Sequence, residues 1–384
     1  MLKFYLTIFG INPYKSVRVN NIIVTTILTG CFSVCTPLAI KFYYSMCDKY
    51  YDEIFDDFPQ VVMAFLIITK FINIHSNQAG FKKLFDLMME ERQLFSSEEE
   101  LYMLDAMNEK GRKLASFYGK TLTMFMSVYL FLPLYHPFMD IISPLNETRP
   151  RQHIYKVNYL FFDEFEYFYT VYLHLASNAA LVVFVLIGID TLYINIIYHA
   201  CGLFAVCGYR VIKTTENYVA QKFEAGTDMS GYEDFKRCVT LHHEALRYYN
   251  VLDNTCRNLY LVQMGINMIL ISVTAVKLIM YLEQLDQAIR SAMFLAGQQF
   301  HLYIISLPGQ KLLDQSSELS NQIYASSWYE TSVVIQKLLH TMQIRSSRSS
   351  ILTAAGLYEM KIESFGITVK TCVSYCTMFL SLRD

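Results

Sequence analysis

The stretch NLYLVQMGINMILISVTAV, residues 258–276, contains no charged side chain and is flanked by Arg257 and Lys277. An α-helix needs about 20 mostly apolar residues to cross the hydrocarbon core of a bilayer. The run therefore has the length and composition of one membrane span. Whether it is one depends on the rest of the chain.

The overall composition favours lipid as the solvent of this chain. Of its 384 residues, 53% are hydrophobic and 17% are charged, whereas about a quarter of the residues are charged in ordinary soluble domains. The formal net charge is −2, and no basic patch exceeds normal loop bias. We therefore expect no nucleic acid partner.

Five other runs of similar length are nearly free of charge, and a less apolar stretch follows at the end of the chain. They are residues 22–40, 58–76, 121–139, 167–189, 291–310 and 362–382. Only helices and closed barrels satisfy their backbone in lipid, and these runs lack the alternation of barrel strands. The sequence predicts an all-α, polytopic membrane protein with seven transmembrane helices.

One more uncharged run leaves an eighth crossing open. Residues 191–209 read TLYINIIYHACGLFAVCGY. Asn195, His199 and the small residues Gly202, Cys207 and Gly208 suit a helix buried against protein better than one surrounded by lipid.

The distribution of basic residues predicts the orientation. Most Lys and Arg residues lie in the segments 1–20, 77–116, 205–257 and 308–350. Basic loops favour the cytoplasm, although these loops are also the longer ones. We expect a cytoplasmic N-terminus and an extracellular C-terminus. The single sequon, at Asn146, then falls outside as a glycosylation site.

The segments expected in the cytoplasm are not simple linkers. Residues 77–116 and 212–257 show helical spacing of apolar residues with charges between them. Residues 307–330 are too polar to cross lipid and have the same helical pattern. We expect helical extensions beneath the membrane, with a helical anchor region in the cytoplasm.

Motifs for catalysis are weak. His242, His243 and Glu244 resemble part of a zinc-protease helix, but Arg247 stands where the second histidine is required. No glycine-rich phosphate loop and no G-x-S-x-G motif is present. The sequence predicts no enzyme, no metal site and no cofactor.

The chain resembles a known family over its full length, and the most specific motifs lie near its C-terminal end. The run LPGQKLLDQSSELSNQIYASSW (307–328), the run MQIRSSRSS (342–350) and the run ILTAAGLYEMKIESFGITVKTCVSYCTMFLSL (351–382) are similar to the C-terminal signature of insect odorant receptors. YHACGLFAVCGYR (198–210) is similar to the family's fourth helix where that helix continues below the membrane. The length and the predicted number of spans agree with this family.

The resemblance implies a ligand-gated, non-selective cation channel in the plasma membrane of olfactory sensory neurons, surrounded by membrane lipids and passing monovalent and divalent cations. Four subunits would meet around their last helices as a heterotetramer with the odorant receptor co-receptor. This chain looks like an odour-tuned subunit, because it lacks the co-receptor's large insertion in the second inner loop. Residues 1–310 would form a six-helix bundle with an odorant pocket and intracellular helical extensions. Residues 311–384 would form the cytoplasmic anchor helix and the pore-lining helix.

The resemblance also gives the polar residues of the last helix a role. At 3.6 residues per turn they share one face, which is the expected pore wall. Matched to the family's final motif, Met378 falls at the hydrophobic gate and Ser381 at the narrow polar position beside it. The expected pore and gate residues are Ile367, Thr371, Ser374, Met378, Ser381 and Leu382. An apolar ring of this kind can close a pore by dewetting.

Lys370 lies beside this face and could point away from the pore axis. A positive charge in a cation path is unfavourable. The alternative interpretations are that Lys370 reaches the membrane interface or pairs with Glu363.

A volatile ligand is small and apolar, so its site should be an aromatic and aliphatic cavity. By resemblance it lies among the outer halves of helices two, three, four and six. The candidate ligand-binding residues are Val62, Phe65, Leu66, Phe131, Tyr135, Tyr172, Leu173, Met293 and Ala296. For each of them, ordinary helix packing is the alternative.

Three other classes of membrane protein are alternatives. A G-protein-coupled receptor would place the N-terminus outside and Asn146 in the cytosol. A secondary transporter would show inverted repeats and interrupted helices. A gustatory receptor would share the architecture and differ in its dependence on the co-receptor.

Overall fold

The computed structural model describes residues 7–8, 10, 14–95, 97–144, 149, 151–225 and 231–381. Within them the chain is almost entirely helical, as the sequence predicts. The helices are α2 (Val17–Cys47), α3 (Tyr51–Ser76), α4 (Gln78–Glu91), α5 (Glu98–Ile142), α6 (Phe168–Ala225), α7 (Tyr232–Met280), α8 (Leu285–Ala325), α9 (Val333–Ser346) and α10 (Ile362–Ser381). Two 3-10 turns (Arg92–Leu94 and Trp328–Glu330) and a two-stranded hairpin, β1 (Thr353–Ala354) with β2 (Tyr358–Glu359), complete these elements.

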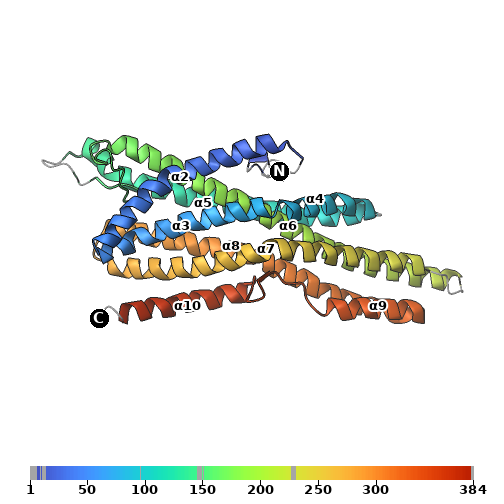
Figure 1. The fold of residues 1–384 in the computed structure, drawn as a ribbon. Coiled ribbons are helices and arrows are strands. Elements are labelled where there is room, and N and C mark those ends of the chain that lie inside the picture. The colour runs from blue at the N-terminus through green and yellow to red at the C-terminus, as the bar shows by residue number, and fades with distance from the viewer. Residues whose placement is uncertain are drawn as a thin grey trace.

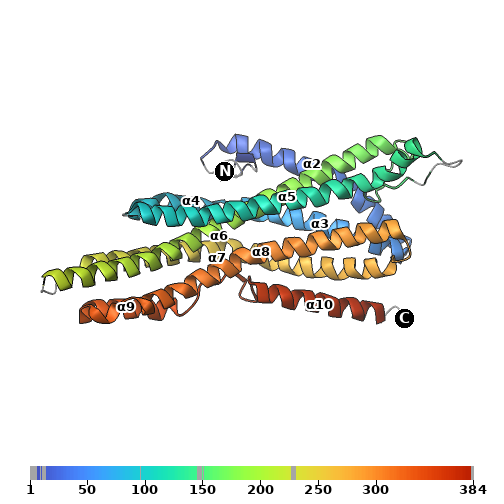
Figure 2. The same ribbon diagram turned by 180° about the vertical axis from the view of Figure 1, so that it is seen from behind.

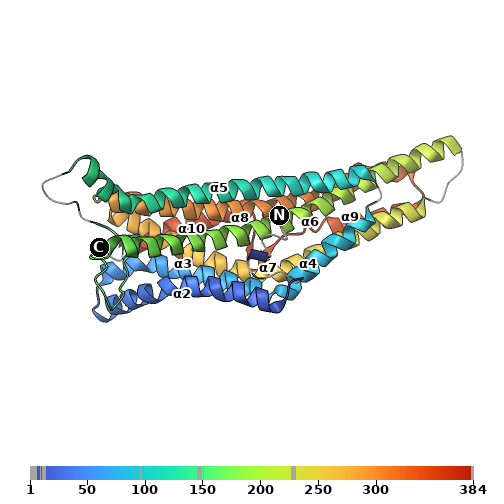
Figure 3. The ribbon, with the colours of Figure 1, turned by 90° about the horizontal axis from the view of Figure 1, so that it is seen from above.

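The helices form one elongated bundle (Figure 1). The C-terminal end of α10 lies at one end of the long axis, and α9 lies at the other (Figures 1 and 2). Seen from above, α5, α6, α7 and α8 run along most of the length (Figure 3). The described part of the N-terminal region lies near the middle of this axis.

The long helices exceed the thickness of a membrane. At 1.5 Å per residue, the 58 residues of α6 extend about 87 Å, whereas the hydrocarbon core is about 30 Å thick. The α9 end of the bundle, where α4 also lies, therefore projects beyond a membrane that covers the other end. This matches the predicted helical extensions.

Five helices are long and apolar enough to cross a membrane, among the residues that the structure describes. They contain the segments Arg18–Cys47, Asp56–Ser76, Glu98–Ile142, Phe168–Phe223 and Tyr232–Met280. Helices α8 and α10, predicted as the sixth and seventh spans, are not among them. Both contain more polar residues, so seven crossings stay a prediction.

The uncharged run 191–209 belongs to α6 and forms no separate helix. Leu192, Ile196, Ala200 and Leu203 are fully buried in the main core. A continuous helix cannot turn back through the membrane, so this run adds no crossing of its own. It packs against protein, as its small and polar residues predict.

The connection between α9 and α10 is fixed to α7 and α8. The Tyr249 hydroxyl donates to the carbonyl oxygen of Ile351 at 2.8 Å, and Asp253 accepts a hydrogen bond from the backbone of Thr353 at 3.0 Å. A Cβ atom on Gly309 of α8 would lie 2.0 Å from the carbonyl oxygen of Met360. Only glycine permits this close approach of the two backbones, which sets where α10 begins.

The predicted boundary at residue 310 falls inside α8. It therefore divides a continuous helix by expected role, with the bundle on one side and the anchor on the other.

Candidate functional site

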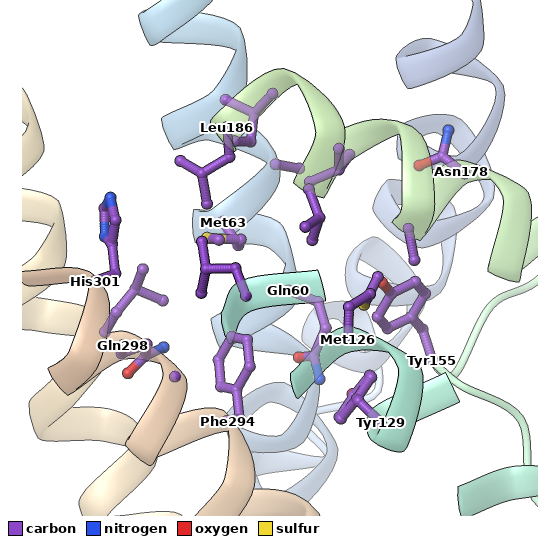
Figure 4. A pocket seen from close by; sticks show the side chains of 18 of the residues that line it. Gln60, Met63, Met126, Tyr129, Tyr155, Asn178, Leu186, Phe294, Gln298 and His301 are labelled. Atoms are coloured by element: carbon purple, nitrogen blue, oxygen red, sulfur yellow. The ribbon is translucent and has the colours of Figure 1, made fainter. Parts of the chain in front are cut away.

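A cavity of about 170 Å³ lies between the helices. Six helices contribute to its wall: α2, α3, α5, α6, α7 and α8. Most of the lining is apolar, with Met63, Phe125 and Phe294 among the larger side chains. Figure 4 shows side chains from several helices pointing into this space. The remaining lining residues include Cys31, Val34, Leu38, Ile67, Leu122, Met126, Tyr155, Ala179, Val182, Leu186, Leu270 and Gly297.

Polar side chains also reach the wall of this cavity. Gln298 of α8 is 7% exposed, and neither its amide nitrogen nor its amide oxygen has a hydrogen-bond partner among the described residues. The amide nitrogen of Asn267 on α7 is also buried without a partner there. A buried unpaired polar atom costs about 1–3 kcal/mol. These atoms are therefore available to a molecule in the cavity.

A buried polar cluster lies beside the cavity and joins four helices. Asp190 of α6 accepts a hydrogen bond from Tyr118 of α5 at 2.7 Å and forms an ion pair with Lys70 of α3. Its other neighbour is His301 of α8, whose Nε2 lies 2.9 Å from the carboxylate. His301 also lines the cavity. A ligand there would contact a residue of the cluster directly.

A second, more polar cavity of about 470 Å³ adjoins the first one. The two share Gln60, Tyr129, Tyr155 and Phe294 as lining residues. Its charged residues include Asp56, Asp57, Lys156, Lys277 and Arg290. The four shared side chains therefore lie between the more polar cavity and the apolar cavity.

One predicted ligand-binding residue, Met293, lines the apolar cavity. Leu66 is 1% exposed and packs with Ile266 and Leu270 in a separate small core, which Val62 also contacts. The Tyr172 hydroxyl donates to the carbonyl oxygen of Leu130 at 2.9 Å.

The other predicted ligand-binding residues lie on outward faces. These are Phe65, Phe131, Tyr135, Leu173 and Ala296, and all five are exposed in the single chain. They lie on the expected helices but do not line this cavity. Their role in ligand binding stays a prediction.

The polar residues of the spans were the missed signal. Gln60, Asn178, Asn267, Gln298 and His301 all lie in hydrophobic helices and all line the cavity. Polar groups in a membrane span face the bundle interior. This rule gives the inward face of α3, α6, α7 and α8, which hydrophobicity alone does not.

Helix α10 is attached to the bundle by a narrow face. Ser364, Thr368, Cys372 and Cys376 are buried, and they recur every four residues. The Cys372 thiol lies 3.6 Å from the carbonyl oxygen of Met268 on α7. Most of the remaining helix surface faces away from the chain.

The predicted pore face is among these outward surfaces. Ile367, Ser374, Met378 and Ser381 are exposed, and Thr371 is half-buried. Exposure does not single this face out, because Val373 on another side is 59% exposed. The assignment to a pore stays a prediction, and Leu382 lies outside the described residues.

Lys370 is exposed as well. Glu363, its suggested partner, instead pairs with Lys361 at 2.9 Å. Asn146, the predicted glycosylation site, lies outside the described residues.

The fold and its long apolar helices define the class of helical polytopic membrane proteins. Two solved structures share this fold, both of the insect olfactory receptor OR5 from Machilis hrabei. The structure with eugenol has a TM-score of 0.79 and the one without it 0.78. In both comparisons the identity is 11%, and the alignment covers 99% of this chain and 97% of the receptor.

A family model described as 7tm Odorant receptor matches residues 50–373. The chain belongs to this odorant receptor family. The match supports the odorant over the gustatory alternative, and the family is not one of enzymes. A comparison with curated proteins finds no match by sequence.

Proposed function

We propose that this chain is an odour-tuned subunit of a ligand-gated, non-selective cation channel. Seven helices would cross the plasma membrane of an olfactory sensory neuron, with the N-terminus and the α9 end in the cytoplasm. The co-receptor would complete the heterotetramer. The observation that carries this proposal is an apolar cavity, lined by residues of six helices, in a chain of the odorant receptor family.

The lining of the cavity fits a volatile ligand. Its wall is mostly aliphatic and aromatic, and burying apolar surface contributes roughly 25 cal/mol per Å². A structural relative was solved with eugenol, a small aromatic molecule. We infer that a ligand of comparable type occupies the cavity of this chain.

Helix α7 offers a direct connection from the cavity to α10. Asn267 and Leu270 line the cavity, and Met268 between them contacts Cys372 of α10. A ligand that moves α7 therefore also moves the surface on which α10 rests. A ligand with higher affinity for the open arrangement would shift the channel towards it.

Expression with and without the co-receptor tests the proposed activity. We expect odour-evoked cation current only when both chains are present, because the proposed channel is a heterotetramer of this chain with the co-receptor. Current from this chain alone, or its absence in the complex across a broad volatile panel, would contradict the proposal.

A pair of substitutions in α8 tests the cavity itself. Gly297 lines the cavity, and a Cβ atom at this position meets nothing within 4 Å. Gly297→Leu should fill the cavity without disturbing helix packing and should abolish activation. Ala292→Leu, at an exposed position of the same helix that does not line the cavity, is the matched control and should respond normally. Equal responses of both variants would place the ligand elsewhere.

A further inference from the structure

We propose that the cavity selects small, otherwise apolar molecules that carry one hydroxyl group, and that the Gln298 amide binds this hydroxyl. The inference rests on the proposed function and specifies its ligand. It starts from the two unpartnered atoms of Gln298 in an apolar cavity (Figure 4).

The amide of Gln298 offers both halves of a hydrogen-bonded pair. Its nitrogen is a donor and its oxygen an acceptor, and both are buried without a partner in the described part of the chain. The Asn267 nitrogen is a second unpartnered donor on the same wall. A hydroxyl oxygen can accept from an N–H group while its proton is donated to the Gln298 oxygen.

Other functional groups match these atoms less well. A hydrocarbon would leave all of them unpaired, and a ketone or an ester would leave the Gln298 oxygen unpaired. A carboxylate would add a charge, but no Lys or Arg is among the residues that line the cavity. The hydroxyl is the simplest group that both accepts a hydrogen bond from an N–H of this lining and donates one to the Gln298 oxygen.

The cavity volume limits the rest of the molecule. An apolar cavity of about 150 Å³ accommodates benzene in another protein, and this one measures about 170 Å³. The ligand is therefore a molecule of about ten non-hydrogen atoms or fewer. Met63, Ile67 and Phe294 would surround its hydrocarbon part.

The test uses primary alcohols, methyl ketones and alkanes of matched chain length, together with benzyl alcohol and toluene. Currents are recorded from the complex with the co-receptor, for the natural chain, Gln298→Met and Gln299→Met. Methionine keeps the length of the side chain. Gln299 is the adjacent residue and does not line the cavity, so its variant is a matched control.

We expect the alcohol to activate the natural chain at a concentration about tenfold lower than the matched alkane does, with the ketone between them. Gln298→Met should remove this preference, and Gln299→Met should keep it. Partitioning into lipid differs between compounds but not between variants. Dividing the alkane-to-alcohol ratio of activating concentrations in the natural chain by the same ratio in Gln298→Met therefore isolates the contribution of Gln298.

Three results would overturn the inference. The first is that the natural chain shows no preference for alcohols, and the second is that the preference survives in Gln298→Met. The third is that no compound of the panel evokes a current. In each case, loss of responses to other volatiles in Gly297→Leu would leave the proposed function intact. Full responses in Gly297→Leu would instead contradict the proposed function itself. Surface labelling of each variant shows that loss of current is not loss of folding.

Discussion

At the scale of single residues, Asp190 holds α6 to three other helices. Its partner Lys70 has a fully buried side chain, and Tyr118 and His301 complete its surroundings. Removing one partner of a buried ion pair leaves an uncompensated charge and costs about 3–5 kcal/mol. We expect Lys70→Met to lower the free energy of unfolding by about this amount, measured by thermal unfolding in detergent.

An exposed ion pair provides the control. Lys213 and Glu216 are 3.9 Å apart and well exposed, so Lys213→Met should change stability by less than about 1 kcal/mol. The double variant Lys70→Met/Asp190→Leu removes both charges and should recover part of the loss. Equal stability of the two single variants would show that the cluster does not hold the helices together.

Glu91 on α4 predicts a pH dependence of stability. Its side chain is 1% exposed, and burial, together with the charge of Glu244, raises its pKa from 4.5 to about 8. Its Oε2 lies 3.3 Å from Nε2 of His199, so the protonated carboxyl can donate to the imidazole.

The sign of this dependence follows from proton binding. Between pH 4.5 and 8 the folded chain holds a proton on Glu91 that the unfolded chain releases. Stability therefore falls as pH rises through this window, by at most about 1.4 kcal/mol per pH unit for one group. Thermal unfolding across this range should show a flatter profile for Glu91→Gln than for Glu90→Gln, its exposed neighbour. Identical profiles would contradict the assignment.

The identities of the residues predict only in part which face of each helix lines the apolar cavity. Val62, Phe65 and Leu66 are as apolar as Met63, Ala64 and Ile67, which line the cavity. In a membrane both the lipid-facing and the inward side of a helix are apolar. Hydrophobicity therefore does not give the rotation of a helix about its axis, whereas the polar residues Gln60 and Gln298 mark the side that lines the cavity.

At the scale of elements, the contact between α8 and the segment before α10 depends on Gly309. A Cβ atom there would meet the backbone oxygen of Met360 at 2.0 Å, and backbone cannot move aside as a side chain can. We expect Gly309→Ala to destabilise the chain by about 1–3 kcal/mol, measured by thermal unfolding. Gly265→Ala on α7, where a Cβ atom meets nothing within 4 Å, is the control. Equal melting temperatures would rule out the tight contact.

The proposed gate in α10 is tested at Met378, which is 46% exposed in the single chain. A ring of large apolar side chains excludes water from a narrow pore, and alanine would widen it. We expect Met378→Ala to increase current in the absence of odour. Unchanged leak and activation in whole-cell recordings would argue against the gate.

Element boundaries were the part of the fold least visible in the sequence. Charge-free runs located each apolar helix but not its full length. Helix α6 continues to Ala225, well past residue 189, where the predicted span ends; only the resemblance of residues 198–210 to a continued fourth helix indicated this extension. Asp190 interrupts the run without interrupting the helix, because Lys70 and Tyr118 compensate its charge. Partners that are distant in sequence made this charge acceptable, and a single sequence does not reveal them.

At the scale of the whole molecule, composition and the C-terminal motifs were enough to predict an all-helical chain and its family, and both are confirmed. The seven crossings and their orientation stay predictions. The arrangement of subunits cannot be inferred from one chain in the same way. Ile367 and Val373 are almost equally exposed, at 57% and 59%, so exposure in the single chain does not show which of them would line the proposed pore. This pair therefore gives the sharpest test of the pore.

The proposal that α10 lines the pore is tested most directly with cysteine substitutions in this helix. Each substituted chain is exposed to a charged, water-soluble thiol reagent during odour-evoked current. Cys372 and Cys376 are buried against the bundle and serve as internal controls. We predict that Ile367→Cys and Ser374→Cys react and lose current, while Val373→Cys does not. Equal reaction at Ile367 and Val373, or none at either, would contradict a pore lined by this helix.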